Sequence, residues 1–181
     1  MTELKQIIPI RRNVAEYAAI GGWWVLLHLL LERSGISGGV MTALVILGCW
    51  TKAVLFGAEN MKQLFDAAKR NLPHHHFLLL MGVNMSQMIL SFMFDFQLLQ
   101  RIDPASFSGV APNAGLSEAL FDFFYLSTLN FSFFGYSDIL PQTVPARIAN
   151  LTEILLAFVT VIFLLSDFIS LKDSLRHESK K

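Results

Sequence analysis

The chain has 181 residues, of which 54% are hydrophobic and only 15% are charged, and its formal net charge is +0. With a mean hydropathy of +0.51, this composition is typical of a membrane protein and excludes an ordinary soluble domain. The balanced charge leaves no basic field for binding nucleic acid, and the single cysteine, Cys49, excludes a disulfide within one chain.

Residues 14–57 predict a two-helix membrane hairpin that follows a polar cytoplasmic leader, residues 1–13. The apolar run Val14–Leu31 has no small-residue cleavage pattern behind it and predicts a retained first span. About eighteen residues at about 1.5 Å each nearly cross a hydrocarbon core of about 30 Å. Glu32–Gly39 predicts a turn, and Val40–Gly57 predicts the second span.

Residues 58–76 predict an amphipathic linker on the cytoplasmic side. Its apolar and charged side chains recur at helical spacing on opposite faces: Met61, Leu64, Phe65 and Ala68 against Glu59, Lys62, Asp66 and Lys69. We expect a helix along the membrane surface, or a linker helix, that ends before Pro73. His74–His76 follow and fit a pH sensor, a metal site or an interfacial polar cap.

The third span, Phe77–Leu99, is unusually polar. Its polar side chains recur at steps of three and four residues and form one stripe along the helix: Asn84, Gln87, Ser91 and Asp95. Polar groups are costly in hydrocarbon, so the stripe should face protein or water instead of lipid. It predicts that the third helix is packed inside a bundle.

A short helix and a loop separate the third span from the fourth. Gln100–Gly115 predicts a loop outside the membrane, and Ser117 is the expected N-cap of an amphipathic helix that runs to about Thr128. An extended run and the turn Gly135–Asp138 follow before the fourth span, Ala146–Leu171. The short helix and its loop are too short and too mixed in character to span a membrane.

The basic residues predict the orientation of the chain. With the N-terminus in the cytoplasm, eleven basic residues lie inside and three outside. The inside set is Lys5, Arg11, Arg12, Lys52, Lys62, Lys69, Arg70, Lys172, Arg176, Lys180 and Lys181, and the outside set is Arg33, Arg101 and Arg147. Lys52 lies within the second span, and its long side chain can extend to the interface. This bias predicts a multi-pass protein of the cell membrane with both termini, including the tail 172–181, in the cytoplasm and the short helix outside.

A loop that re-enters the membrane here can conduct ions. Irregular backbone is tolerated at membrane depth only where protein buries it or where it lines water. A short helix aimed inward turns the negative end of its dipole toward the cavity, which favours a cation, and an extended Ser132–Tyr136 can offer a column of carbonyl oxygens. One loop cannot surround an ion, so this interpretation requires several subunits.

The stretch Phe124–Pro141 resembles the pore loop of the potassium-channel superfamily. The matching positions are Phe124-Tyr125-Leu126-Ser127 for an aromatic pair and a Ser or Thr, Gly135-Tyr136 for Gly-Tyr, Asp138 for Asp and Ile139-Leu140-Pro141 for an apolar pair and Pro. Further on, Thr143, Ala146-Arg147 and Glu153 are similar to a pattern of prokaryotic two-helix pore domains.

The resemblance implies a potassium-channel-like pore domain over residues 77–171 and a homotetramer embedded in the lipid bilayer. The implied filter residues are Ser132, Phe133, Phe134, Gly135, Tyr136, Ser137 and Asp138. Potassium would be held at Ser132, Phe133, Phe134, Gly135 and Tyr136. The permeant ion is a monovalent cation, potassium or sodium, and no other cofactor is implied.

Residues of the fourth span are candidates for a brace and for a gate. Glu153, Thr160 and Asp167 are seven apart on one face, where Glu153 is expected to brace the short helix from behind. Asp167 fits two roles, concentrating cations at the inner mouth or pairing with the polar stripe of the third helix. The apolar side chains of Phe158, Ile162 and Leu165 fit either a hydrophobic constriction or ordinary bundle packing.

Three departures from the family pattern keep a second interpretation open. Phe133 and Ser137 replace a Thr and a Gly of the filter, and Ala157 stands where a hinge Gly is common. These departures fit a non-conducting membrane scaffold or regulatory subunit with a pore fold. The sequence holds no nucleophile triad, phosphate loop or zinc motif, so no enzyme is expected. The overall prediction is an all-α membrane protein with four transmembrane helices, and with a re-entrant pore helix and filter-like loop between the third and the fourth.

Overall fold

The computed structural model describes residues 10–33, 35–70, 74–111, 113–133, 135 and 137–178, and this part of the chain is almost entirely helical. Its elements are α2 (Ile10–Arg33), α3 (Gly38–Arg70), α4 (His74–Ile102), β1 (Phe107–Ser108), α5 (Leu116–Ser132), β2 (Leu140–Pro141) and α6 (Val144–Glu178). Four of the helices contain segments long and apolar enough to cross a membrane: Arg12–Arg33, Gly38–Glu59, Leu78–Ile102 and Val144–Ile162. The predicted all-α class with four spanning helices is confirmed at this level, and the chain has the build of a multi-pass membrane protein.

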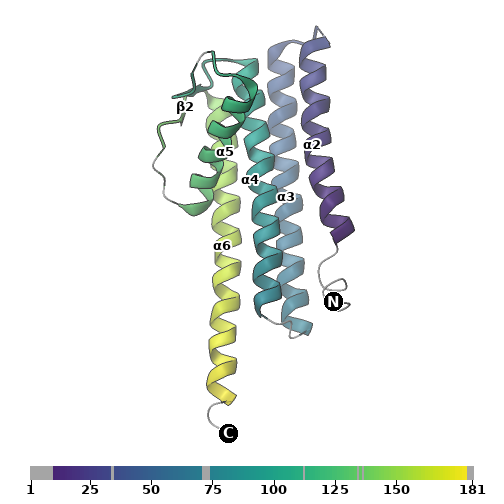
Figure 1. Cartoon of the computed structure of the whole chain (residues 1–181), viewed down its shortest axis with the longest axis vertical. Helices are drawn as coiled ribbons and strands as arrows, with labels where there is room; N and C mark the ends of the chain where they lie inside the picture. The colour runs from purple at the N-terminus through teal and green to yellow at the C-terminus, as the bar shows by residue number, and fades with distance from the viewer. Residues whose placement is uncertain are drawn as a thin grey trace.

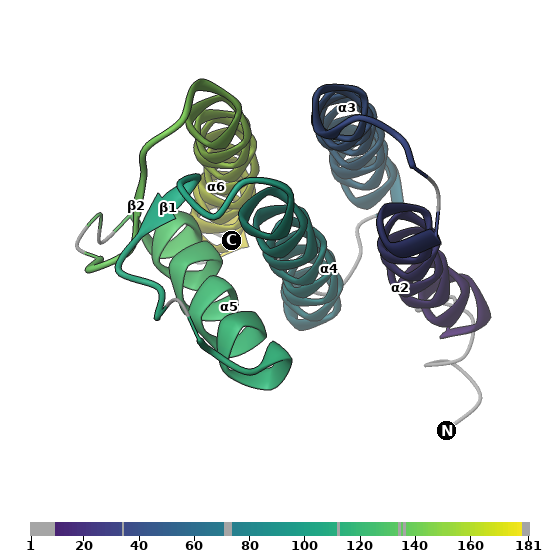
Figure 2. The same cartoon turned by 90° about the horizontal axis from the view of Figure 1, so that it is seen from above.

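The four long helices run alternately up and down, as Figure 1 shows. Helices α2 and α6 therefore direct the two ends of the chain toward the same end of the bundle, whereas α5 and the strands lie at the other end. Helix α4 occupies the centre and contacts α2, α3, α5 and α6 (Figure 2). Helix α5 leans on both α4 and α6.

Helix α3 is a single unbroken helix from Gly38 to Arg70. The prediction of a separate surface helix after Gly57 is therefore wrong, because residues 58–70 continue the second span. At about 1.5 Å per residue the helix is about 50 Å long and exceeds the thickness of a hydrocarbon core. The continuation has a physical reason, since the sequence between Gly57 and Pro73 holds no glycine or proline to break a helix. His74–His76 open α4, and their side chains lie outside the described residues.

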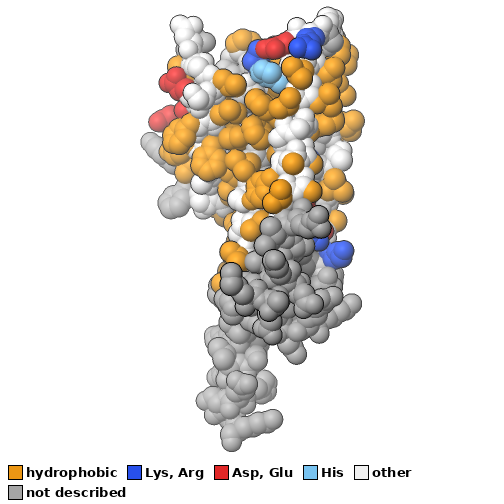
Figure 3. Space-filling model, turned by 45° about the vertical axis from the view of Figure 1, so that its right-hand side comes forward, with side chains coloured by type: hydrophobic (Ala, Val, Ile, Leu, Met, Phe, Trp, Pro, Cys, Tyr) orange, Lys and Arg blue, Asp and Glu red, His pale blue; other side chains and the backbone are white. Residues whose placement is uncertain are grey.

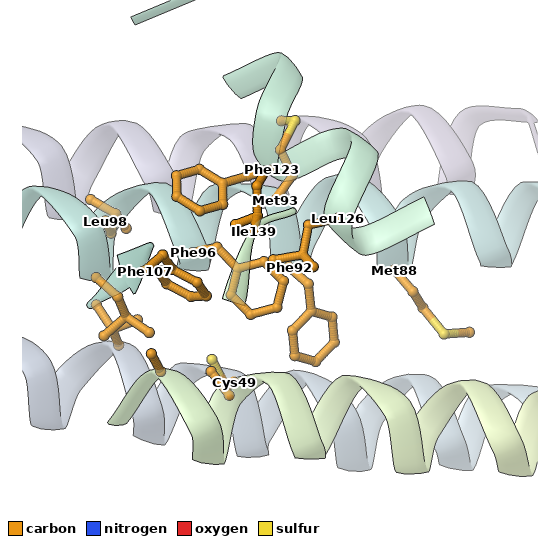
Figure 4. Close-up of a cluster of buried hydrophobic side chains, with 14 of the residues drawn as sticks. Cys49, Met88, Phe92, Met93, Phe96, Leu98, Phe107, Phe123, Leu126 and Ile139 are labelled. Carbon is orange, nitrogen blue, oxygen red and sulfur yellow. The ribbon is translucent and has the colours of Figure 1, made fainter. Parts of the chain in front are cut away.

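The polar stripe of α4 is buried, which confirms that the third helix is packed inside a bundle. The exposed fractions of its side chains are 3% for Asn84, 1% for Gln87, 0% for Ser91 and 1% for Asp95. The apolar core beside it joins α4 to the loop end of the molecule. Figure 4 shows that Phe96 of α4, Phe107 of β1 and Phe123 of α5 turn toward one another, with ring centroids 5.1 to 6.2 Å apart. Such aromatic clusters stabilise a core beyond their buried area.

Helix α5 begins earlier and ends later than the sequence predicted. Its N-cap is Gly115, so the expected N-cap role of Ser117 is wrong, and no side chain caps the helix there. The helix continues past Thr128 to Ser132. Burial explains the extension, because Asn130 and Phe131 are 9% and 4% exposed and pack into the bundle only if the last turn is helical.

The outer loop is tied to the chain that returns from α5. Strands β1 and β2 pair antiparallel, with Phe107 opposite Pro141 and Ser108 opposite Leu140. The backbone N–H of Gln142 donates to the carbonyl of Ser106 at 2.8 Å, and its side chain donates to Ser108 Oγ at 2.8 Å. These bonds hold the return segment against the end of α4.

Replacing Gly109 with alanine is expected to lower the free energy of unfolding by about 1–3 kcal/mol and to loosen the strand pair. Gly109 has a φ of +87°, and a Cβ there would lie 2.1 Å from the carbonyl oxygen of Asp138. The matched control is Gly115→Ala, because Gly115 has a φ of −61° and nothing lies within 4 Å of its added Cβ. Hydrogen exchange of residues 105–111 and 139–143 measures the effect, and equal exchange in the two variants would contradict it.

Candidate functional site

Helix α5 packs on the side of α4 and α6 and extends part of the way down them from the loop end. Figure 1 shows it descending from the loop end beside α6, after which the chain turns back to β2 at the end from which it came. Its C-terminal half is bonded to Glu153, nine residues after α6 begins at Val144. At about 1.5 Å per residue, this contact lies about 14 Å below the start of α6. Glu153 therefore lies inside the candidate span Val144–Ile162 and not at its outer end.

The buried side chain of Glu153 holds helix α5 in place. Both oxygens of Glu153 accept hydrogen bonds from α5, one from Ser127 Oγ and the other from Asn130 Nδ2 at 2.6 Å. Asn130 Nδ2 also donates to Asn150 Oδ1 at 2.9 Å, and Ser127 Oγ lies 3.1 Å from the carbonyl oxygen of Ile89 in α4. The side chain of Glu153 is 0% exposed. These are the contacts that a brace behind the short helix requires.

The hydrogen bonds around Glu153 could be predicted only in part from the sequence. Ser127 and Asn130 are three residues apart on one predicted helix, as are Asn150 and Glu153 on another. Residues three apart share a helix face, so this matching pair of spacings is the signal for a polar contact between the two helices. Glu153 was predicted as a brace, whereas Asn130, which bonds it, and Asn150, which bonds Asn130, were not predicted.

The predicted filter residues do not form one extended run. Ser132 is the last residue of α5, with its Oγ donating to the carbonyl of Leu129 at 3.0 Å, and Phe133 is the C-cap with a left-handed φ of 56°. The prediction of an extended Ser132 and Phe133 is therefore wrong, because the buried last turn of α5 keeps Ser132 helical. Gly135 is exposed with a φ of +61°. Phe134 and Tyr136 lie outside the described residues.

The end of the return segment has a local turn of its own. Ser137 Oγ accepts a hydrogen bond from the backbone N–H of Ile139 at 3.0 Å, which fixes the backbone around an exposed Asp138. Ile139 is 5% exposed and belongs to the aromatic core of Figure 4. The segment is therefore anchored at both of its ends, by Glu153 through α5 and by Ile139 with β2.

One face of α6 is an exposed apolar stripe that contains the candidate gate residues. Its members follow at steps of four and three residues: Leu151, Leu155, Phe158, Ile162 and Leu165. The ring of Phe133 stands edge-on to that of Phe158, with centroids 6.4 Å apart. The structure thus brings the end of α5 next to the gate candidates. Thr160 is buried on another face, and the side chain of Asp167 lies outside the described residues.

A second buried charge pair lies between α3 and α4. Lys52 Nζ is 2.5 Å from Asp95 Oδ2, which also accepts a hydrogen bond from Cys49 Sγ at 3.1 Å. The side chains of Asp95 and Lys52 are 1% and 16% exposed. The prediction that Lys52 extends to an interface is therefore wrong, because the carboxylate of α4 holds the ammonium inside the bundle. The sequence showed both residues but gave no sign of their pairing.

No protein family, curated protein or solved structure matches this chain.

Proposed function

We propose that this chain is one subunit of a homotetrameric, potassium-channel-like channel for monovalent cations. The observation that carries the proposal is helix α5, which a buried Glu153 holds within the fourth candidate span while the chain returns to its starting end. The last carbonyls of a helix have no partner within the helix, and its C-terminal end carries a partial negative charge. A helix that ends at this depth therefore favours a cation beside it.

The uncovered surface of a single chain supports assembly. The apolar stripe of α6 is exposed, with Leu151, Phe158 and Leu165 at 57%, 55% and 54%. On the neighbouring α5, Phe121 and Tyr125 are 69% and 47% exposed. In a tetramer with the α5 ends facing the axis, other copies would cover the aromatic side chains of α5. The lower part of the α6 stripe would then line a hydrophobic constriction.

The oxygen ligands in this proposal come from the end of α5 and the segment after it. Asn130 O already accepts the N–H of Phe133, so the carbonyls offered to an ion are those of Phe131 and Ser132, which follow it in the last turn. The carbonyl of Gly135 lies in an exposed stretch. Carbonyl oxygens are the ligands that replace the hydration shell of potassium or sodium in a selectivity filter.

A second candidate function is a non-conducting membrane scaffold or regulatory subunit. The observation that favours it is Phe133, which is 46% exposed and packs edge-on against Phe158. Four such pairs near one axis would fill the space that an ion needs. The two functions therefore differ in what Phe133 does in the assembled protein.

Recording from purified protein in planar bilayers separates the two functions. We expect tetramers that give unitary cation currents with either potassium or sodium present. Gly135→Val should abolish the currents, because Gly135 has a positive φ that a β-branched side chain rarely adopts. Gly82→Ala is the matched control, since Gly82 lies in α4 with nothing within 4 Å of an added Cβ, and it should conduct as the natural chain does.

Two outcomes of the same recordings would contradict the channel. Silent but well-folded tetramers that stay silent with Phe133→Thr and Ser137→Gly would exclude conduction through this loop. Currents that appear only in this double variant would show that the natural chain is the scaffold. Crosslinking in vesicles gives the number of subunits independently of conduction.

A further inference from the structure

Helix α2 is attached to α4 through polar side chains along its whole length. Each contact joins residues 69 to 73 positions apart, so the two helices lie parallel with a fixed register. The pairs are Glu16 with Gln87, Tyr17 with Ser86, Trp24 with Gln97, His28 with Arg101 and Glu32 with Arg101. Few apolar residues of α2 are buried, with Leu27 at 1%. Polar contacts therefore decide how α2 is held.

The contact at the loop end of the bundle contains a titratable group. Arg101 Nη1 is 3.3 Å from His28 Nε2, and Arg101 Nη2 donates to Glu32 Oε1 at 2.7 Å. His28 Nε2 is itself 3.5 Å from Glu32 Oε1. In the described residues, the charged groups that face His28 are Glu32 of its own helix and Arg101 of α4. Figure 3 shows a histidine beside acidic and basic side chains at the upper end of this face, above a band of apolar side chains.

The geometry fixes where the proton of His28 sits. A guanidinium can only donate, so His28 Nε2 must be the acceptor in its contact with Arg101, and the ring proton is then on Nδ1. His28 Nδ1 is buried without a hydrogen-bond partner. Protonation adds a hydrogen to Nε2, which faces Arg101. The bond between His28 and Arg101 is then lost, and the new N–H turns to Glu32, whose Oε1 lies 3.5 Å from Nε2.

We propose that His28, Glu32 and Arg101 form a pH-responsive latch between α2 and α4. Imidazole side chains change charge between about pH 5 and pH 8. Above this transition the latch is closed, because Arg101 bonds both His28 and Glu32. Below it the latch is open, because protonated His28 repels Arg101 and competes with it for Glu32. The latch does not depend on whether the protein conducts.

The latch is connected, through Gln100 and the pair of β1 and β2, to the segment that returns from α5. Arg101 follows Gln100, whose side-chain carbonyl accepts the N–H of Phe107 at 2.9 Å. Phe107 lies in β1, which pairs with β2 on the segment that returns from α5. Opening the latch therefore frees the end of α4 where it holds this strand pair.

Tryptophan fluorescence can report the latch directly. The rings of Trp24 and His28 have centroids 5.2 Å apart, and a protonated imidazole quenches a neighbouring indole. Trp23→Phe and Trp50→Phe leave Trp24 as the single tryptophan, and both replaced side chains are exposed. In micelles, we expect the emission of this protein to fall as the pH is lowered. His28→Gln keeps an acceptor for Arg101 but does not titrate, so its emission should stay constant.

Two further variants test the partners by the direction of their effect. Glu32→Gln removes the anion that favours protonated His28, so the midpoint of the transition should move to lower pH. Arg101→Gln removes the facing cation, so the midpoint should move to higher pH. Hydrogen exchange of residues 98–110 at low pH should be faster in the natural chain than in His28→Gln at the same pH. A transition that survives in His28→Gln, midpoints that do not move in opposite directions, or equal exchange would overturn the latch.

Discussion

Replacing Glu153 with leucine is expected to lower the free energy of unfolding by about 3–5 kcal/mol and to release α5 from the bundle. Glu153 accepts hydrogen bonds from Ser127 and Asn130 with its two oxygens and is fully buried. A hydrogen bond contributes about 0.5–1.5 kcal/mol net, and a buried donor left without its acceptor costs about 1–3 kcal/mol. The variant loses both hydrogen bonds. Ser127 keeps the carbonyl of Ile89 as an acceptor, so the greater loss falls on Asn130.

Glu153→Gln is the control that separates hydrogen bonding from packing. The glutamine carbonyl can accept from Asn130, while its N–H can donate to Ser127 Oγ if the hydroxyl turns to Ile89. We therefore expect a smaller loss than in the leucine variant. Denaturant unfolding in micelles, followed by circular dichroism, measures the difference, and hydrogen exchange shows whether α5 is the part that loosens. Equal stability of the two variants would show that Glu153 does not brace α5.

The spans and the interior of the bundle could be predicted from the sequence because both depend on local pattern. Four apolar runs of sufficient length give four helices that can cross a membrane. The stripe from Asn84 to Asp95 follows the helical period, and lipid excludes such a stripe, so its burial follows from the sequence alone. Glu153 was identified from its match to the pore-domain pattern and from the helix face that it shares with Thr160 and Asp167.

The errors arise where tertiary contacts decide the outcome. The end of α5 depends on the burial of Asn130 and Phe131, and no residue before Gly135 marks it in the sequence. The extended conformation predicted for Ser132 and Phe133 is wrong for this reason. Lys52 was predicted to reach an interface because a lysine stem is long enough, but the sequence does not show that Asp95 of another helix lies 2.5 Å from its ammonium.

Helix α3 shows the same distinction between pattern and boundary. The change to an amphipathic pattern after Gly57 predicts the start of a new helix. In the structure, α3 continues without a break to Arg70. A change in the surroundings of a helix, from membrane to water, alters which residues it carries but does not end its hydrogen bonds. Glycine and proline are the usual signals that end a helix, and neither stands between Gly57 and Arg70.

Removing Lys52 alone is expected to destabilise the protein by about 3–5 kcal/mol, because it leaves a buried carboxylate without its cation. Asp95 is 1% exposed, and the thiol of Cys49 is a weak donor that cannot replace an ammonium. Lys52→Met removes the charge and keeps most of the apolar stem. Lys62→Met is the matched control, since Lys62 is exposed on the same helix, and it should have little effect.

The Lys52–Asp95 ion pair as a whole should contribute far less to the free energy of unfolding than the loss on removing one partner suggests. Replacing a buried ion pair by apolar residues is often neutral or stabilising, because the cost of taking two charges out of water on folding is then avoided. We therefore expect the double variant Lys52→Met with Asp95→Leu to recover most of the stability that Lys52→Met loses. Asp95→Leu alone should lose less than Lys52→Met, because the side chain of Lys52 is 16% exposed and can move its ammonium toward water.

A double-mutant cycle of unfolding free energies in micelles measures this coupling. The coupling energy is the difference between the loss in the double variant and the sum of the losses in the two single variants. If its size is close to the loss in Lys52→Met, the pair specifies how α3 is placed against α4, while the apolar core supplies the stability. Losses that simply add in the double variant would contradict the pairing, because two residues that do not interact have no coupling energy. The same four proteins can be compared by crosslinking between α3 and α4, which reports the register that the charge pair is expected to fix.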